Sequence, residues 1–472
     1  MHRGLSLYPC VLLSLAAALG HCRDDPRPPI DPMAFGSEDI IERDVVIIGG
    51  GSSGTYTAVR LQQDYNKTVA IIEKQATLGG HAQTYTDPST GFTIDLGVIV
   101  FSQSETVTDY FARFDVPLVT SPATETENLY VDFSTGKTVD FQPPGSEAVG
   151  AALSSYVARL QEYPALQGSF NMTYPVDADL LLPFGEFVAK YQLGDMVPQV
   201  FAANQGYAPL LNISTLYMFK YLNLDEINSF SEGFLTTAHQ NVQELYEKAA
   251  TSLGSDNVLL DSTVVSIDRS GEGPAQIVVD TPAGRKLIQA KKVVSTVPPL
   301  IKNLEAYDLS EEERGLFSQF HANGYYTGLL NNTGLNVTLN AAAPDQPYGV
   351  PELPGPYSMR INQGLTHVYY GSPDVMTEED VKADMIANVR RFQESNGISL
   401  NREPEFVAFA NHAPFNLMVS NEAIADGFYE KLFALQGQRN TFYSGAAWHT
   451  QDSSVLWRFT DDCILPILLA SL

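Results

Sequence analysis

The chain has 472 residues, too many for one ordinary hydrophobic core and enough for two or three domains. Its 28 Lys and Arg stand against 55 Asp and Glu, a formal net charge of -27 at pH 7. A surface this negative repels nucleic-acid phosphates and anionic membrane surfaces, so we expect neither as a partner.

The first twenty residues have the pattern of a secretory signal peptide. His2 and Arg3 give a short basic start, residues 5–19 are nearly all apolar, and residues 16–18 offer a small-residue cleavage site. The apolar run is shorter than the roughly 20 residues that a membrane anchor needs, so no membrane anchor is expected. We therefore expect a secreted protein or one in the lumen of the secretory pathway, with residues 21–42 as a linker.

Glycosylation and cysteine patterns bear on the same compartment. The chain has N-x-S/T sequons at Asn66, Asn171, Asn212, Asn331 and Asn336, which agree with a glycosylated product. Removal of the leader with Cys10 leaves two cysteines, Cys22 and Cys463. Either they form a disulfide, or Cys463 is a buried thiol and Cys22 belongs to a loose tail. No spacing typical of a metal site occurs, so no metal is expected.

A βαβ unit is predicted directly after the linker. Residues 44–48 form a continuous apolar run, which is typical of a strand buried on both faces. A glycine-rich turn follows at 49–54, then a helix at 55–65 and a second buried strand at 69–72.

The turn satisfies G-x-G-x-x-G at Gly49, Gly51 and Gly54. These glycines allow, in order, a tight turn, close approach of a pyrophosphate to the backbone, and close packing of helix on sheet. The first helical turn, including Ser53, then presents free N–H groups to the phosphates. Glu73 ends the second strand, where a ribose hydroxyl partner is expected, so this unit predicts a dinucleotide site, with NAD and FAD both possible.

The remaining elements alternate between two kinds of segment. Residues 105–224 mix prolines, aromatics and helices, as at 150–160 and 183–191, and a second insertion covers 311–404, with strands at 325–330 and 366–370 and a helix at 377–394. Between them we expect a helix at 236–253, strands within 258–268, a hairpin of 276–280 with 286–289, and a strand at 292–297. The tail closes with a strand at 441–446 and a helix from Ser453.

Several motifs resemble the flavin-containing amine oxidase superfamily. They are LGGH at 78–81, TIDLG at 93–97, VVSI at 264–267, VVSTVPP at 293–299 and YSGA at 443–446. The leader, GGGSSGTY and SGAAWHTQDSS are most similar to fungal flavin oxidoreductases of the β-cyclopiazonate dehydrogenase type. The resemblance implies an α/β protein with a Rossmann-type FAD-binding domain, from 43–110, 225–310 and 405–472, and a discontinuous α+β substrate-binding domain, from 111–224 and 311–404.

The resemblance also implies a set of FAD contacts. Gly80 and His81 would lie beside the cofactor, the backbone at Val264 would meet adenine, and Gly445 would precede the last flavin-facing helix. Asp452 or Ser453 is a natural N-cap of that helix, whose N-terminus either serves only as a capped end or points at the flavin pyrimidine ring.

Three departures from the family pattern bear on the reaction. His81 stands where the amine oxidases usually have arginine, Ala446 stands where they have glutamate, and residues 325–330 lack the lysine that many place near flavin N5. A neutral His81 either hydrogen-bonds or packs near the cofactor, or attacks the flavin 8α carbon to form a covalent histidyl-flavin. FAD is thus expected, while plain amine oxidation is not implied.

The function that follows is hydride transfer from a small organic substrate to FAD, with dioxygen or another acceptor reoxidising the flavin. In a fungal setting, implied by resemblance, the substrate would be a secondary metabolite. An amine oxidase, a redox-neutral double-bond isomerase and a non-catalytic flavin carrier remain alternatives. Four strand tyrosines are predicted to wall an aromatic cavity or to belong to the core: Tyr325, Tyr326, Tyr369 and Tyr370. Trp448 and His449 are expected to line the flavin, with a purely structural role as the alternative for His449.

Overall fold

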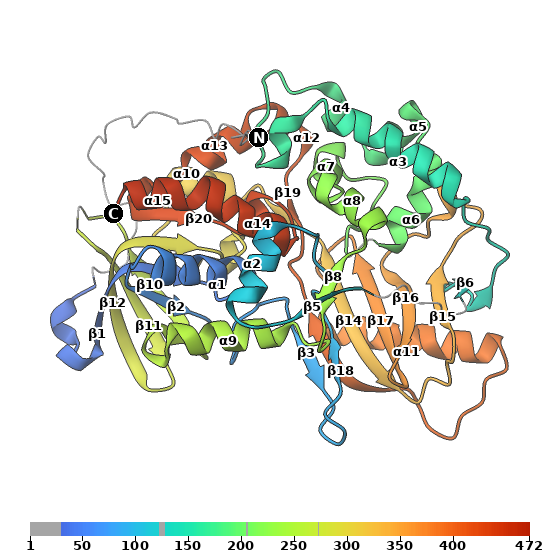
Figure 1. Ribbon diagram of the computed structural model, residues 1–472, viewed down its shortest axis with the longest axis horizontal. Coiled ribbons are helices and arrows are strands. Elements are labelled where there is room, and N and C mark those ends of the chain that lie inside the picture. Colours follow the sequence, from blue (N-terminus) through green and yellow to red (C-terminus); the bar gives the residue numbers. More distant parts are fainter. Residues whose placement is uncertain (1–29, 122–127, 204–205, 272) are drawn as a thin grey trace, which may run out of the picture.

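The computed structural model describes residues 30–121, 128–203, 206–271 and 273–472. Its architecture has two sheets in two halves, with the first sheet and its helices on the left of Figure 1 and the second on the right. The predicted leader at residues 1–20, Cys22 and the linker up to residue 29 lie outside the described residues. The rest of the predicted linker holds two short 3-10 turns, and its last three residues already belong to the first strand, which begins at Ile40 and not at Asp44. Helices and strands alternate along the chain, which confirms the predicted α/β class.

The first sheet has seven strands. Six follow the order β10-β11-β12-β1-β2-β9, and the seventh, β20, pairs with the C-terminal end of β12. Its strands are β1 (Ile40–Ile48), β2 (Val69–Ile72), β9 (Val258–Leu259), β10 (Thr263–Asp268), β11 (Ala275–Thr281), β12 (Gly284–Ser295) and β20 (Thr441–Tyr443). Strand β1 lies parallel to both β12 and β2 at the centre of the sheet. The four consecutive residues Val45–Ile48 are buried because a central parallel strand is covered on both faces.

Helices cover this first sheet. Helix α1 (Ser52–Val59) continues through a π-helical turn (Arg60–Asp64), and both α9 (Gln243–Leu253) and α14 (Ser453–Phe459) contact it. Helix α2 (Glu105–Arg113) packs on α14, so elements from the beginning and the end of the chain lie side by side (Figure 1). A second π-helical turn (Thr460–Ile464) joins α14 to α15 (Leu465–Ala470).

Two predicted elements need correction. The helix expected at 236–253 begins as a strand, β8 (Leu235–Thr237), which pairs with β5 (Leu118–Thr120), and the helix proper starts at Gln243. The hairpin strand at 286–289 and the strand at 292–297 are one continuous strand, β12, which ends at Ser295, because β1 pairs with it from Leu287 to Ser295.

The second sheet has the order β18-β14-β17-β16-β15-β6-β7. Its strands are β6 (Asn128–Asp132), β7 (Lys137–Thr138), β14 (Gly324–Asn331), β15 (Thr338–Ala341), β16 (Gly355–Asn362), β17 (Leu365–Ser372) and β18 (Glu405–Asn411). The sequence placed residues 405–411 in the FAD-binding domain; instead they pair with β14 in this sheet. Helix α11 (Glu378–Ser395) lies against it (Figure 1).

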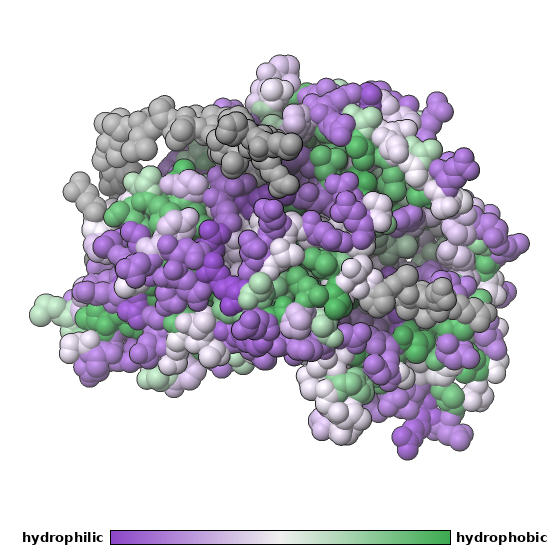
Figure 2. Space-filling view, in the orientation of Figure 1, coloured by the Kyte–Doolittle hydropathy of each residue, from purple (hydrophilic) through white to green (hydrophobic). Residues whose placement is uncertain are grey.

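Small elements complete the two halves. Two-stranded pairs are formed by β3 (Thr84–Thr86) with β4 (Thr93–Asp95), and by β13 (His321–Ala322) with β19 (Leu417–Met418). The first insertion is helical, with α3 (Ser146–Leu160), α4 (Ala178–Leu181), α5 (Phe184–Tyr191), α6 (Val197–Ala202), α7 (Thr215–Tyr221) and α8 (Leu224–Glu232). Helices α10 (Glu311–Phe317) and α12 (Asn421–Ala425) both contact α13 (Phe428–Ala434). The face in Figure 2 is mostly hydrophilic, as the charge predicts.

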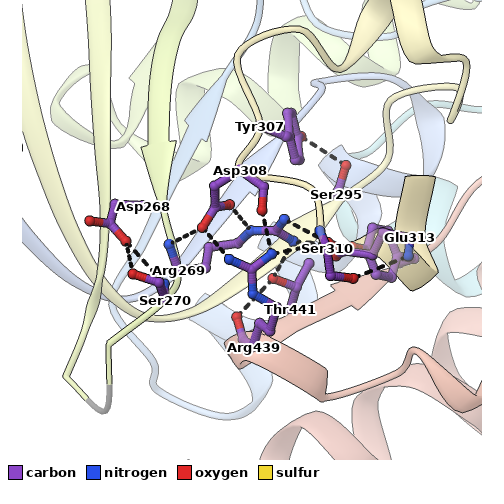
Figure 3. Close-up of polar contacts among 11 residues, drawn as sticks. Asp268, Arg269, Ser270, Ser295, Tyr307, Asp308, Ser310, Glu313, Arg439 and Thr441 are labelled. Carbon is purple, nitrogen blue, oxygen red and sulfur yellow. Dashed lines mark hydrogen bonds and ion pairs between the residues drawn. The ribbon is translucent and has the colours of Figure 1, made fainter. Parts of the chain in front are cut away.

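A buried ion cluster anchors the ends of the first sheet (Figure 3). Arg269 donates to Asp308 through Nε at 2.7 Å and to Glu313 through Nη1 at 2.9 Å, with its own side chain fully buried. Arg439 also pairs with Glu313, at 3.2 Å, so two cations face two carboxylates. Arg269 further donates to Thr441 at the start of β20, which ties this strand to β10.

Candidate functional site

The glycine-rich turn between β1 and α1 has the geometry predicted for a phosphate loop. Gly49 has φ +100°, a value that favours glycine, and a Cβ there would lie 2.6 Å from Thr296 Oγ1. A Cβ on Gly54 would lie 2.0 Å from the Gly49 carbonyl oxygen, so any side chain there would separate the helix from the turn. Gly51 is different, because a Cβ there would meet only the Cα of Gly80, at 3.9 Å.

Glu73 lies at the end of β2, where the sequence predicts a ribose partner. Its Oε2 accepts a hydrogen bond from Gly50 N at 2.6 Å and its Oε1 accepts one from Gln75 N at 2.9 Å. These bonds fix the buried carboxylate beside the turn. Each carboxylate oxygen has a further lone pair, so the group can still accept a bond from a ribose hydroxyl.

The Gly79–Gly80–His81 segment runs along the same turn. Gly79 N donates to the Gly50 carbonyl at 2.8 Å, and a Cβ on Gly80 would lie 3.0 Å from the Gly51 Cα. Beneath the segment, the ring of Tyr246 leaves no room for a side chain at Gly79. The predicted residues Gly51 and Gly80 therefore face each other across the place where a pyrophosphate would enter.

The C-terminal segment reaches this turn through β20. Gly445 follows the strand with φ +102°, and a Cβ there would lie 3.4 Å from the carbonyl oxygen of Thr296. Thr296 in turn donates to the Gly49 carbonyl at 2.9 Å. The predicted residues Gly445 and Gly49 thus lie on either side of Thr296, which follows β12.

Helix α14 brings its N-terminus to the N-terminus of α1. Asp452 caps α14 by accepting a hydrogen bond from Ser454 N at 2.8 Å. Ser52 Oγ donates to Ser453 Oγ at 2.9 Å and accepts a bond from Trp457 Nε1 at 2.9 Å. Two positive ends of helix dipoles therefore meet at one place, which favours binding of an anionic group.

The last predicted contact, Val264, lies apart from this cluster. It belongs to β10, beside a bulge between Val264 and Ser266, and no described hydrogen bond joins it to the glycine turn. The connection is indirect, because Ser262 N donates to the carbonyl of Glu73 at 2.9 Å. Val264 lies two residues after Ser262, and its contact with adenine stays a prediction.

The residues present fit a bound FAD. Helix α1 begins at Gly51 without a side-chain cap, so its first N–H groups can face the phosphates. In the described part of the chain, the buried Oδ2 of Asp452 has no hydrogen-bond partner, and flavin or ribityl donors would provide one. Ser53 is buried in the first turn of α1, next to these free N–H groups.

His81 faces away from the phosphate loop toward the second half of the molecule. Its ring stacks with Phe415 at 5.8 Å between centroids and meets the ring of His412 edge-on at 5.0 Å. Burial lowers the pKa of His81 to about 4, opposed by a hydrogen bond to Gln451, so the imidazole is neutral near pH 7. Gln451 directly precedes Asp452, so His81 lies between the phosphate loop and the cap of α14.

The second sheet forms the opposite wall of the site. Because side chains alternate along a strand, Tyr325 and Thr327 of β14 point to one face, and Thr327 donates to the carbonyl of Leu96 on the FAD-binding side. Tyr369 lies opposite Thr327 in register and shares that face. Tyr326 and Tyr370 point the other way, where their hydroxyls bond Met376 and Asp384. Of the four predicted tyrosines, Tyr325 and Tyr369 face the site and the other two belong to the packing under α11.

Trp448 and His449 lie between Gly445 and Asp452 in the C-terminal segment, and contacts within the protein hold both side chains. Trp448 is buried and stacks on Tyr443 at 5.2 Å between ring centroids. His449 Nε2 lies 3.1 Å from the Nζ of the buried Lys220 and 3.0 Å from the carbonyl oxygen of Gln167. Burial lowers the pKa of Lys220 well below its usual range, and its Nζ also donates to the carbonyl oxygens of Leu166 and Ser169.

A cavity of about 210 Å³ opens in the second half of the molecule. Its lining is mostly apolar and includes Tyr130, Phe141, Phe201 and Tyr357. Tyr357 also forms a side-chain hydrogen bond with Tyr325, whose ring stacks against His412. The cavity is thus adjacent to the wall that faces His81. Among the described residues no group of three or more His, Cys, Asp or Glu side chains could hold a metal ion.

The fold and this site define a flavoprotein with a phosphate loop on a βαβ unit and a second sheet closing over the flavin. Residues 52–326 match the family model described as "Flavin containing amine oxidoreductase". The chain belongs to this family and is an enzyme that binds FAD.

Full-length relatives support the assignment. The chain is 39% identical over 482 residues to "FAD-dependent oxidoreductase oblC" of Cochliobolus heterostrophus, with 99% of each chain covered. It is 35% identical over 435 residues to "Beta-cyclopiazonate dehydrogenase" of Aspergillus flavus, covering 90% of this chain and 93% of that one. These relatives confirm the predicted resemblance and identify an FAD-dependent oxidoreductase.

Solved structures share the fold. A fatty acid isomerase from P. acnes, described as producing CLA, superimposes with a TM-score of 0.70 at 21% identity, over 90% of this chain and 98% of that one. Putrescine oxidase bound to putrescine superimposes with a TM-score of 0.64 at 16% identity, over 91% of this chain and 100% of that one. At these identities the similarity concerns the fold alone.

Proposed function

We propose that this FAD-dependent oxidoreductase removes a hydride from a C–H bond of a small organic molecule in fungal secondary metabolism. The observation that carries the proposal is the alignment, at 35% identity over nearly the whole chain, with β-cyclopiazonate dehydrogenase. Bound FAD supplies the hydride acceptor, and dioxygen or another acceptor would then restore the oxidised cofactor.

The chain's own residues would hold the two reactants. The turn at Gly49–Gly54 and the N-termini of α1 and α14 would fix the cofactor, while Tyr325, Phe415 and His412 would form the wall against which the substrate lies. This wall is aromatic and buried, so it would exclude water from the reacting atoms. The adjoining cavity of about 210 Å³ has room for the remaining part of an apolar substrate.

The experiment that tests this function starts from cells that lack the protein. A compound that accumulates in those cells is added to the purified yellow protein in the absence of oxygen. We expect the absorption of oxidised FAD to disappear at a rate that depends on the compound and to return when air is admitted. A flavin that stays oxidised with every accumulated compound would overturn the proposed oxidation.

A redox-neutral isomerisation is the second candidate, because the fatty acid isomerase from P. acnes shares the fold with a TM-score of 0.70. The family glutamate and the family lysine are absent at 446 and at 325–330, which also separates this chain from plain amine oxidases. Turnover without consumption of oxygen or reduction of a dye would identify an isomerase.

We further propose export through the secretory pathway. Four of the sequon asparagines, Asn66, Asn212, Asn331 and Asn336, are exposed on the folded chain, and Asn171 is partly buried. No helix in the described residues is long and apolar enough to cross a membrane. Glycosidase treatment of the protein from its native host should increase its electrophoretic mobility, whereas an unshifted band that begins at Met1 would overturn the proposal.

A further inference from the structure

The histidine that faces His81 has a fixed tautomer. His412 Nε2 lies 3.2 Å from the carbonyl oxygen of Leu96. A carbonyl oxygen only accepts hydrogen bonds, so Nε2 must carry the proton and donate. Thr327 donates to the same oxygen, which has two lone pairs and can accept both bonds. The other ring nitrogen of His412, Nδ1, is therefore a bare acceptor.

This acceptor is buried and has no protein partner. His412 is 1% exposed, and among the described residues no donor reaches its Nδ1. Burial, together with the neighbouring His81, lowers the pKa of His412 to about 3, so a second proton does not occupy Nδ1 near neutral pH. A buried acceptor without a donor destabilises the folded chain, so the arrangement is typical of a site that a ligand completes.

The surroundings of the ring show where such a ligand would lie. The ring of Tyr325 stacks on His412 at 5.2 Å, and Phe415 touches both Tyr325 and His81. On the opposite side, a Cβ on Gly97 would lie 2.8 Å from His412 Cε1, so the missing side chain at Gly97 lets the histidine approach the FAD-binding half. His412 thus stands between the wall of tyrosines and the residue next to the phosphate loop.

We infer that His412 Nδ1 accepts a hydrogen bond from an uncharged hydroxyl or N–H group of the substrate and so selects substrates that carry this donor. The inference rests on the proposed function, which places the substrate against this wall. Because the same surroundings disfavour an imidazolium at both His81 and His412, they also disfavour a cationic ammonium group. The donor is therefore neutral, unlike the protonated form of a simple amine.

The experiment compares two small probes that differ in one donor. 4-Chlorophenol carries a hydroxyl that stays protonated at pH 7, and 4-chlorotoluene replaces it with a methyl group of similar size. Each is titrated into the FAD-loaded full-length protein, with the flavin absorption spectrum as the readout. One hydrogen bond to the buried nitrogen should make the phenol bind about tenfold more tightly than the toluene.

The variant His412→Phe keeps a ring and removes the acceptor, so it should bind both probes equally. Thr327→Val is the matched control, since it removes the other hydrogen bond to Leu96 and leaves Nδ1 intact; it should keep the tenfold preference. If His412→Phe does not retain FAD, the smaller apolar change His412→Leu, which offers no hydrogen-bond acceptor, replaces it.

Three outcomes would overturn the inference: equal binding of the two probes by the wild-type protein, binding of neither, or a preference that survives in His412→Phe. The titration needs bound FAD but no turnover. Failure here with normal flavin reduction by the substrate therefore refutes only the role of His412, whereas a flavin that no substrate reduces refutes the proposed function.

Discussion

Ser52 and Ser453 are joined by a hydrogen bond of 2.9 Å between their side-chain oxygens, although 401 positions separate them in the chain. Each serine lies in the first turn of a helix, α1 or α14. The bond therefore fixes the relative position of two helix N-termini, one predicted to face the phosphates of FAD and the other predicted to face its flavin ring. The first prediction concerns the glycine that precedes Ser52.

Gly51→Val should abolish FAD loading while the protein still folds. The backbone of Gly51 has φ -65°, which valine can adopt, and a Cβ there meets only Gly80, at 3.9 Å. The side chain would instead fill the space that the pyrophosphate needs. Gly54→Val is the contrasting variant, because its Cβ would lie 2.0 Å from the Gly49 carbonyl oxygen and should prevent folding.

The measurement combines flavin absorption with circular dichroism. A soluble, folded and colourless Gly51→Val protein is expected, and an insoluble Gly54→Val protein beside it. Normal flavin content in Gly51→Val would show that the phosphates bind elsewhere.

The way in which His81 holds the flavin is decided by acid precipitation. Gln451 and Phe415 hold the neutral ring of His81 within the protein, so we expect a non-covalent contact. Denaturation in acid should then release FAD into the supernatant. His81→Ala removes the hydrogen bond to Gln451, which precedes the cap of α14, and should weaken FAD binding through the position of that segment. Yellow colour that stays in the pellet, and is lost in His81→Ala, would instead establish a covalent histidyl-flavin.

Stability should fall at acid pH because of His367. This residue is 1% exposed, and burial lowers its pKa to about 3 with a further contribution from Arg360. Below pH 6.5 the unfolded chain binds a proton at this histidine that the folded chain does not, so the free energy of unfolding decreases as the pH falls from 6.5 toward 3. The full effect is about 1.4 kcal/mol per pH unit.

Denaturant unfolding at a series of pH values between 7 and 4 measures this dependence. His367→Phe should show a shallower slope than the wild-type protein over this interval. His239→Phe is the control, because the side chain of His239 is 57% exposed and solvent reaches it in the folded chain. Parallel curves for His367→Phe and the wild type would contradict the prediction.

The ion cluster of Figure 3 should dominate the stability of the first sheet. Arg269→Met leaves the buried carboxylates of Asp308 and Glu313 with one cation, Arg439, so the free energy of unfolding should drop by about 3–5 kcal/mol. Arg285→Met removes an exposed ion pair with Asp280 on the neighbouring strand, so it should change the free energy of unfolding little. Thermal unfolding of the two variants side by side tests this contrast, and similar melting temperatures would count against it.

The glycine turn could be predicted from sequence because its geometry is local. Gly49, Gly51 and Gly54 follow a buried strand within six residues, and their spacing alone is enough to identify the turn. The clash that excludes a side chain at Gly54 comes from Gly49 in the same turn. Glu73 and the cap at Asp452 are equally local, which explains why the structure places them beside this turn and at the start of α14.

His412 could not be found in the same way. It reaches the site only because β18 pairs with β14 and carries the following residues to Leu96, which lies 316 positions earlier. The boundary of β8 was missed for a similar reason, since its three residues become a strand through pairing with β5 in a distant segment. Gly97, in the TIDLG motif, was the one sequence feature that pointed to His412, because the missing side chain at this glycine makes room for the histidine ring.

The bond between Ser52 and Ser453 also orders events during biosynthesis. The phosphate loop is made early, but the flavin end of the site needs Gly445, Asp452 and Ser453, which leave the ribosome hundreds of residues later. Until then the chain holds an open half-site that can touch only the nucleotide portion of FAD. Tight capture of the cofactor is therefore a late step, and a nascent chain that stalls before residue 445 should be released without colour.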